Sequence, residues 1–174
     1  ISKPWFFLKL VYCFKYCALL YACKKLSEML EVAEVKAPAT EAVVNARWQK
    51  CVWNASFNPV SVLGGPVDTI TLLNSPGGEQ LIRDLMAEVS KIALSTGNKM
   101  PDELIDRYIA ATKSAPPYKT SMALDKERGQ AMEVEVILGN TVRAGRRAGI
   151  DIPKLESVYA LMQALVAMSE NQAQ

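Results

Sequence analysis

Apolar residues recur at intervals of three and four along most of the chain from Leu26 onward, and this spacing predicts α-helices rather than strands. The clearest run lies between Leu81 and Ala93, where polar residues fill the gaps between apolar ones. The alternation of apolar and polar residues that is typical of half-buried strands does not occur here. We therefore expect an all-α domain of five or six helices over residues 41–170, followed by a short tail at 171–174.

Proline and glycine divide this pattern into segments. We expect Pro59 to end the helix that carries residues 47–58, because proline lacks the backbone N–H of a helical hydrogen bond. Residues 63–75 are expected to form a loop, and Pro76 to lie in the first turn of the next helix. Pro153 is expected to begin the last helix.

Residues 5–23 are apolar and aromatic, and a segment of this length suggests a membrane span. Lys9 and Lys15 oppose that interpretation, because each costs about 2.5 to 3.5 kcal/mol near the bilayer centre while each Leu, Phe or Val returns about 0.3 to 0.6 kcal/mol. We therefore expect no membrane span, although an anchor stays open as an alternative. Residues 1–40 are assigned to an apolar segment and linker that precede the helical domain.

Composition narrows the classes of function. Half of the 174 residues are hydrophobic, which is enough to bury a core. Lys and Arg number 20 against 18 Asp and Glu, and the net charge of +2 is far below that of a dedicated nucleic-acid-binding protein, so no nucleic-acid partner is expected. The chain contains no histidine, which excludes Ser-His-Asp and Cys-His catalysis.

The four cysteines stand at positions 13, 17, 23 and 51 and lack the C-x-x-C spacing of structural zinc sites. We expect no metal site and no disulfide framework. Their pattern is typical of reduced, partly buried thiols, so a reducing compartment, the cytoplasm, is expected.

Three polar residues, Lys50, Asn54 and Asn58, stand at steps of four in an otherwise apolar helix. At 100° per residue they fall within about 80° of arc and extend along about 12 Å of the helix axis, so they form one polar stripe. A solvated surface strip is one interpretation, since lysine and asparagine are usually exposed. The other is a ligand site. There the flanking Trp53 and Phe57 would desolvate the ammonium, which would then serve as a general acid, while the carboxamides hold carboxylate and hydroxyl oxygens.

Further candidate residues lie in the second half of the chain. Ser121 stands where the chain enters a helix, and is either an N-cap or a ligand contact. Glu133 lies among apolar residues, and either hydrogen-bonds a ligand hydroxyl or is an ordinary exposed carboxylate. The arginines at 143, 146 and 147 form a basic helix end, which either complements the helix dipole or binds phosphate.

These residues together resemble a known family. The pattern K-x-x-x-N-x-x-x-N-P from Lys50 to Pro59 is followed about sixty residues later by T-S-M-x-x-D, which begins at Thr120, and then by Glu133. In this order and spacing they are similar to the C-terminal helical domain of ketopantoate reductases, a domain of the 6-phosphogluconate-dehydrogenase-like type. The resemblance runs from about residue 46 to residue 162.

The resemblance implies a mechanism. In the family, NADPH delivers a hydride to the ketone of 2-dehydropantoate, and the lysine that matches Lys50 donates a proton to the developing alkoxide. Asn54, Asn58 and Ser121 match residues that hold the substrate. Glu133 matches a glutamate that contacts the cofactor. A 2-oxo acid is thus the implied substrate, and a homodimer formed through the helical domain is compatible with it.

The chain also departs from the family pattern. Asp68 stands where some members have a substrate-binding asparagine, so its carboxylate either disfavours an anionic substrate or points away. The family's N-terminal Rossmann domain, with its G-x-G-x-x-G turn, has no counterpart before Lys50, and residues 1–40 are at most a remnant of it. Two functions therefore stay open. One is the catalytic half of a reductase, and the other is a truncated helical association module tethered to a membrane by residues 5–23.

Overall fold

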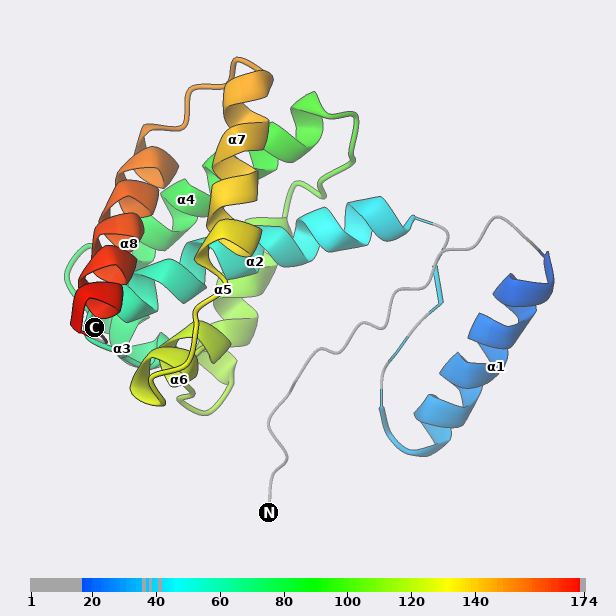
Figure 1. Cartoon of the computed structure of the whole chain (residues 1–174). Helices are drawn as coiled ribbons and strands as arrows, with labels where there is room; N and C mark the ends of the chain where they lie inside the picture. Colours follow the sequence, from blue (N-terminus) through cyan, green and yellow to red (C-terminus); the bar gives the residue numbers. More distant parts are fainter. Residues whose placement is uncertain (1–16, 36, 38, 41, 173–174) are drawn as a thin grey trace. The chain divides into compact units, whose positions relative to one another are not determined.

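The computed structural model describes residues 17–35, 37, 39–40 and 42–172 (Figure 1). The chain forms two compact units, with the boundary after Trp48. The described residues form α-helices, one short π-helix and a single isolated β-bridge between Asp68 and Lys119, without any strand. The prediction of an all-α fold is confirmed. The division into domains at residue 40 stays a prediction.

The first unit contains helix α1, Cys17–Val32. Its apolar spacing was expected only from Leu26, but the helix extends further toward the N-terminus. Met29 and Val32 are 70% and 89% exposed. Much of the apolar segment 5–23 lies outside the described residues, and no helix within them is long and apolar enough to cross a membrane.

Helix α2, Val43–Leu63, carries the polar stripe and continues past Pro59. The expectation that Pro59 ends this helix is wrong. Proline removes one hydrogen bond, to the carbonyl of Ala55. However, every residue from Ala55 to Val62 is buried, and the helix continues to Leu63, after which Gly64 N donates to Val60 O at 2.9 Å. Burial of this whole segment outweighs the loss of a single backbone bond.

The remaining helices follow at short intervals. Their bounds are α3 Thr69–Asn74, α4 Gly78–Ser95, α5 Leu104–Ser114, α6 Ser121–Glu127, the π-helix η1 Glu135–Gly139, α7 Asn140–Arg147 and α8 Pro153–Gln172. Two of them correct the sequence-based expectation, because α3 occupies part of the expected loop at 63–75 and η1 was not foreseen. Pro153 begins the last helix, as expected.

Helix α4 lies at the centre of the second unit and contacts α3, α5, α7 and α8 (Figure 1). Its apolar positions at 82, 85, 86, 89 and 92 are fully buried, as the spacing predicts. Gly145 lets α7 approach α4 closely, since a Cβ atom at this position would lie 3.0 Å from Ile92 Cδ1 and 2.7 Å from Ile152 Cδ1. The core therefore forms around α4, and α2 carries the polar stripe into the same unit.

Candidate functional site

The polar stripe on α2 runs from solvent into the interior. Lys50 is exposed, Asn54 is half-buried and Asn58 is only 1% exposed. A strip that is solvated along its whole length is therefore excluded, because its inner end lies in the core.

The carboxamide of Asn58 is buried without a partner. Neither its Nδ2 nor its Oδ1 forms a hydrogen bond with any described residue, and the Oγ1 of Thr69 shares this condition. A buried polar group without a hydrogen bond costs about 1–3 kcal/mol, and most such groups in folded proteins are bonded. Asn58 is thus an unsatisfied buried polar side chain among the described residues.

Aromatic rings line one side of the stripe. Trp53 stacks on Phe57 with 4.6 Å between ring centroids and on Tyr118 with 6.2 Å. The Nε1–H of Trp53 donates to Thr112 Oγ1 at 3.2 Å. The rings thus pack against each other and against the rest of the unit, and Lys50 stays exposed. Among the described residues, the flanking rings therefore do not bury the ammonium of Lys50 as expected.

The start of α6 lies beside the inner end of the stripe. The hydroxyl groups of Ser61 and Thr120 share a hydrogen bond of 2.8 Å, and Ser61 Oγ also donates to Asn58 O at 2.9 Å. Thr120 caps α6 by accepting from Ala123 N at 3.2 Å, so the interpretation of Ser121 as the N-cap is wrong. Ser121 is the first residue of α6, exposed and next to Thr120. The structure therefore brings Ser121 toward the Asn58 end of α2.

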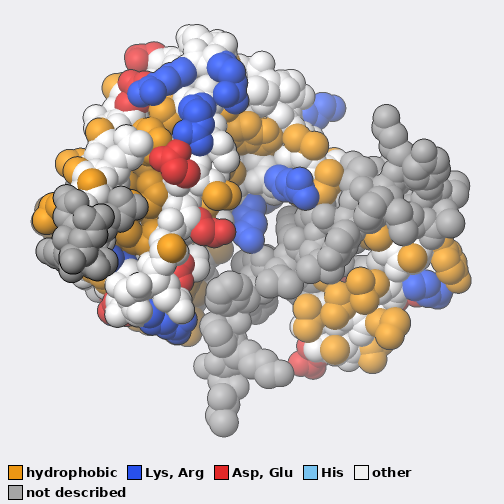
Figure 2. Space-filling view, viewed as in Figure 1, with side chains coloured by type: hydrophobic (Ala, Val, Ile, Leu, Met, Phe, Trp, Pro, Cys, Tyr) orange, Lys and Arg blue, Asp and Glu red, His pale blue; other side chains and the backbone are white. Residues whose placement is uncertain are grey.

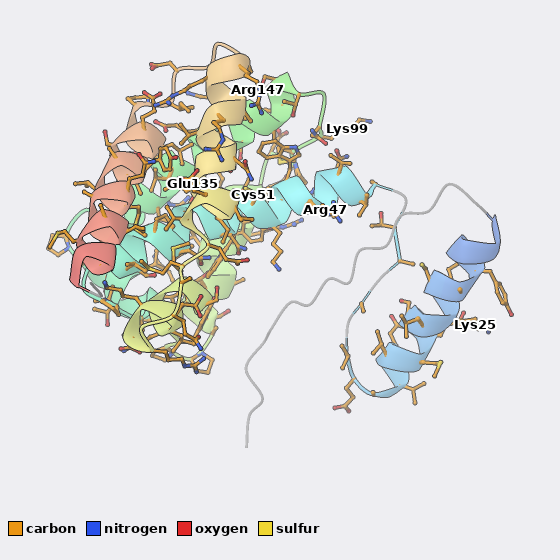
Figure 3. All side chains as sticks on the ribbon, in the orientation of Figure 1. Lys25, Arg47, Cys51, Lys99, Glu135 and Arg147 are labelled. Atoms are coloured by element: carbon orange, nitrogen blue, oxygen red, sulfur yellow. The ribbon has the colours of Figure 1, made fainter. Side chains whose placement is uncertain are left out.

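Glu133 lies further away. Its carbonyl accepts from Ile137 N at 3.0 Å, and the Ile137 carbonyl accepts from Thr141 Oγ1 at 2.7 Å. The hydroxyl of Thr141 in turn lies 3.2 Å from the sulfur of Cys51, the neighbour of Lys50. Figure 3 shows Cys51 on α2. Glu133 is thus two helical turns from the contact with α2, and within the described residues no hydrogen bond or ion pair joins its side chain to the stripe.

Burial raises the pKa of the Cys51 thiol, and its hydrogen bond with Thr141 offsets this effect only in part. The thiol is free and remains protonated at neutral pH. This agrees with the interpretation of Cys51 as a reduced, partly buried thiol.

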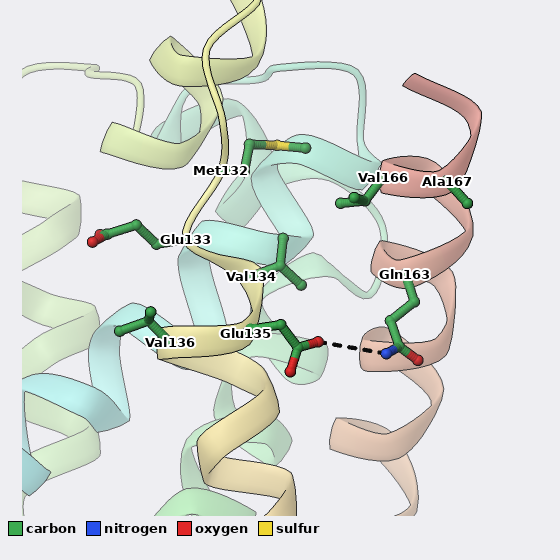
Figure 4. Close-up of a pocket in the computed structure, with 8 residues that line it drawn as sticks. All are labelled: Met132, Glu133, Val134, Glu135, Val136, Gln163, Val166 and Ala167. Carbon is green, nitrogen blue, oxygen red and sulfur yellow. Dashed lines mark hydrogen bonds between the residues drawn. The ribbon is translucent and has the colours of Figure 1, made fainter. Parts of the chain in front are cut away.

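An open pocket of about 290 Å³ lies between η1 and α8 (Figure 4). Its lining is mostly apolar and consists of Met132, Glu133, Val134, Glu135, Val136, Gln163, Val166 and Ala167. The carboxylate of Glu133 points away from Gln163 and α8. Glu133 is exposed, so its carboxylate can accept a hydrogen bond from a ligand outside this pocket.

A second carboxylate, that of Glu135, connects η1 to α7 and α8 by hydrogen bonds. It accepts from Tyr159 Oη at 2.6 Å, from Arg143 Nη1 at 2.7 Å and from Gln163 Nε2 at 3.4 Å. These bonds, above all those from Tyr159 and Arg143, hold the pKa of Glu135 below its usual value. The bonds from Tyr159 and Gln163 thereby hold the π-helix against α8. The sequence does not predict this role, since Glu135 has no distinctive spacing to Tyr159.

Asp68 is a helix cap. Its Oδ1 accepts from Ile70 N and Thr71 N, both at 2.9 Å, and its Oδ2 accepts from Thr71 Oγ1 at 2.6 Å. The bond from the Thr71 hydroxyl is the largest cause that lowers the pKa of the Asp68 carboxyl. Of the two interpretations of Asp68, the structure supports a carboxylate directed into α3, where it satisfies backbone N–H groups.

Basic side chains gather over the end of α7, whose last turn contains Arg146 and Arg147 (Figure 2). Arg146 Nε pairs with Glu156 at 2.7 Å. Two of the three arginines at this helix end are therefore engaged in ion pairs, since Arg143 pairs with Glu135. This supports a role at the negative end of the helix dipole over phosphate binding. In the part of the chain that the structure describes, no three Cys, Asp or Glu side chains gather as metal ligands would.

Comparisons with known proteins agree on one family. Residues 42–166 match the family described as the ketopantoate reductase PanE/ApbA C-terminal domain. A 2-dehydropantoate 2-reductase of Nostoc sp. is 30% identical over 136 residues, which are 78% of this chain and 42% of that protein. An uncharacterized protein of Saccharomyces cerevisiae is 35% identical over 122 residues, which are 67% of this chain and 34% of that protein.

Solved structures give the same result. The crystal structure of 2-dehydropantoate 2-reductase from Methylococcus capsulatus superposes with a TM-score of 0.79 at 49% identity, over 85% of this chain and 47% of that one. The chain thus spans less than half the length of each of these three relatives.

Proposed function

The chain belongs to the ketopantoate reductase family, through the C-terminal domain of those enzymes, and from this premise we propose that it forms the substrate-binding and proton-donating half of a reductase. The substrate is 2-dehydropantoate or a related 2-oxo acid, and the product is pantoate, for pantothenate biosynthesis, or the corresponding 2-hydroxy acid. The observation that carries the proposal is the buried, unpartnered amide of Asn58 in line with the exposed Lys50. If Asn58 had only a structural role, its buried side chain would be expected to form hydrogen bonds with neighbouring residues.

The chemistry follows from the stripe. Lys50 donates a proton to the ketone oxygen during reduction, and its positive charge stabilises the negative charge that develops there. Asn54 and Asn58 orient the substrate by hydrogen bonds from their carboxamides, and Ser121 adds a hydroxyl at the start of α6. The exposure of Lys50 suits this role, because the reacting ketone must reach the ammonium from outside the chain.

NADPH, when bound, supplies the hydride. Its fit to this chain is limited to Glu133, whose exposed carboxylate can accept a hydrogen bond from a ribose hydroxyl. The nine glycines of the sequence include no G-x-G-x-x-G turn for a pyrophosphate. The rest of a nucleotide site would have to come from residues outside this sequence. We also place the reaction in the cytoplasm, where the free Cys51 would stay reduced.

A hybrid enzyme tests this proposal. Residues 42–172 of this chain would replace the matching part of the Methylococcus capsulatus reductase, and oxidation of NADPH by 2-dehydropantoate would be followed. Lys50→Ala should lower kcat by about 10²- to 10⁴-fold, the usual contribution of a general acid. Lys91→Ala is the matched control, because Lys91 is also exposed but lies on α4.

The urea midpoint of the Lys50→Ala hybrid should stay within experimental error of the parent. A loss of activity that only parallels a loss of stability would make Lys50 structural and contradict the proposal. Self-association or vesicle binding of the whole chain, without any reductase activity of the hybrid, would favour the association module instead. Dimers of an active hybrid are compatible with the proposal.

A further inference from the structure

The π-helix η1 lies between Glu133 and α7 and affects the direction in which Glu133 points. Within η1 the backbone bond from Asn140 N to Glu135 O spans five residues instead of the four of an α-helix. One extra residue rotates the preceding segment by about 100° relative to α7. The carboxylate of Glu133, which points away from α8 (Figure 4), therefore depends on the π geometry for its direction.

The side chain of Glu135 holds η1 in place. The π geometry is rare in proteins, so it requires contacts that favour it. On the α8 side, Glu135 accepts from Tyr159 Oη at 2.6 Å and more weakly from Gln163 Nε2 at 3.4 Å. On the α7 side, Arg143 donates to the Glu135 carboxylate at 2.7 Å and to its carbonyl at 3.3 Å. One residue thus connects η1 to both neighbouring helices.

Gly139 makes room for this carboxylate. A Cβ atom at position 139 would lie 2.5 Å from Glu135 Oε2 and 3.1 Å from Arg143 Nη1. A carbon and an oxygen atom without a bond between them do not approach as closely as 2.5 Å, so a larger residue at this position would displace the carboxylate. The bonds of Glu135 therefore require a glycine at position 139.

We propose that Glu135 is a positioning residue, which lies over Gly139, keeps η1 in its π geometry and so directs the carboxylate of Glu133 toward a ribose hydroxyl of the nucleotide. This inference rests on the proposed function, in which Glu133 contacts the cofactor. Glu135 itself is not expected to bind the nucleotide, because its oxygens already accept from side chains of α7 and α8.

The test measures the dissociation constant of NADPH from the hybrid enzyme, followed by the fluorescence of NADPH. Glu133→Ala should raise this constant by about tenfold, as expected for the loss of a hydrogen bond to a charged group. Glu135→Ala should raise it by a similar factor and raise KM for NADPH, while kcat stays near that of the parent because Lys50 is unchanged. Glu135→Gln keeps an oxygen that can accept from Tyr159, and should restore most of the affinity.

Two further variants separate geometry from charge and from stability. Gly139→Ala removes no carboxylate, yet it should weaken NADPH binding as Glu135→Ala does, because the added methyl displaces the Glu135 side chain. Glu156→Ala is the matched control. It breaks an ion pair between α7 and α8, from Arg146 to Glu156 at 2.7 Å, without removing a bond of η1, and should leave the constant unchanged. Urea unfolding of each hybrid checks that it is folded during the measurement.

A double-mutant cycle decides whether Glu135 acts through Glu133. In a Glu133→Ala background, Glu135→Ala should have almost no further effect, because the group that it positions is already absent. Additive effects, or an unchanged constant in Glu135→Ala alone, would overturn the inference and leave the proposed function intact. If Glu133→Ala itself leaves the constant unchanged, the proposed cofactor contact fails and the inference fails with it.

Discussion

Two buried polar sites in the second unit differ in how well they are satisfied. On α4, Glu88 is 7% exposed, and its two oxygens accept from Lys154 N at 3.1 Å and Leu155 N at 2.8 Å, at the start of α8. On α2, Asn58 is as deeply buried and bonds nothing through its side chain. The Glu88 carboxylate accepts from two N–H groups that would otherwise lack partners. The Asn58 carboxamide has no partner for its own polar atoms.

The difference separates a structural from a functional role. The carboxylate of Glu88 also lies at the positive end of the α8 dipole, so both hydrogen bonding and charge favour it there. Asn58 lowers the stability of the chain unless something outside the described residues bonds it. Binding sites commonly carry such a cost, because groups arranged for a ligand are not arranged for the fold alone.

The largest effect is expected at the satisfied site. Glu88→Ala removes two hydrogen bonds to a charged group and should cost about 3 kcal/mol or more in the free energy of unfolding. Urea unfolding of the whole chain measures this cost, and Glu103→Ala, an exposed glutamate, is the control. A cost below about 1 kcal/mol would remove the contrast between Glu88 and Asn58.

A change of opposite sign is expected at the unsatisfied site. Asn58→Leu replaces unbonded polar atoms with apolar ones of similar size and should raise the free energy of unfolding by about 1 to 2 kcal/mol. The hybrid enzyme that carries it should lose most of its kcat/KM. Asn74→Leu, at an exposed position, should give no such gain. A destabilised Asn58→Leu would mean that Asn58 is structural after all.

The smallest effect on stability is expected at Asp68. Its carboxylate is hydrogen-bonded, like that of Glu88, although the hydroxyl of the next residue, Thr69, is not. Asp68→Ala removes the cap of α3 and should cost about 1 kcal/mol at pH 7. Hydrogen bonds from Thr71 lower the pKa of Asp68 in the folded state, so this stabilisation is present above the unfolded pKa of about 4 and is lost as the pH falls through the lower, folded pKa.

Unfolding by urea at several pH values checks this dependence. The difference between the parent and Asp68→Ala should shrink below about pH 4, where the unfolded carboxyl binds a proton. Asp68→Asn keeps a capping side chain without the titration, so it should retain most of the stability at pH 7. A difference that stays constant down to pH 2 would argue against the cap.

Much of the fold was predictable from local pattern. The buried face of α4 follows from its spacing, and Pro153 correctly predicts the start of α8 because proline suits a first turn. Pro59 misled the same reasoning, since the cost of one missing hydrogen bond depends on how much of the surrounding helix is buried. Helix α3 is not predicted from local pattern, because it is short and its start depends on the side-chain cap from Asp68.

The sequence by itself determined that the chain is helical, which family it resembles, and that Lys50, Asn54 and Asn58 share one face of α2, because these depend on residue spacing along a regular helix. Only the tertiary structure decided that this face runs from solvent into the core and that the hydroxyl groups of Ser61 and Thr120 bond each other beside its inner end. Burial and the loss of hydrogen-bond partners arise when segments distant in the sequence pack together. The spacing of residues within one helix does not predict that packing.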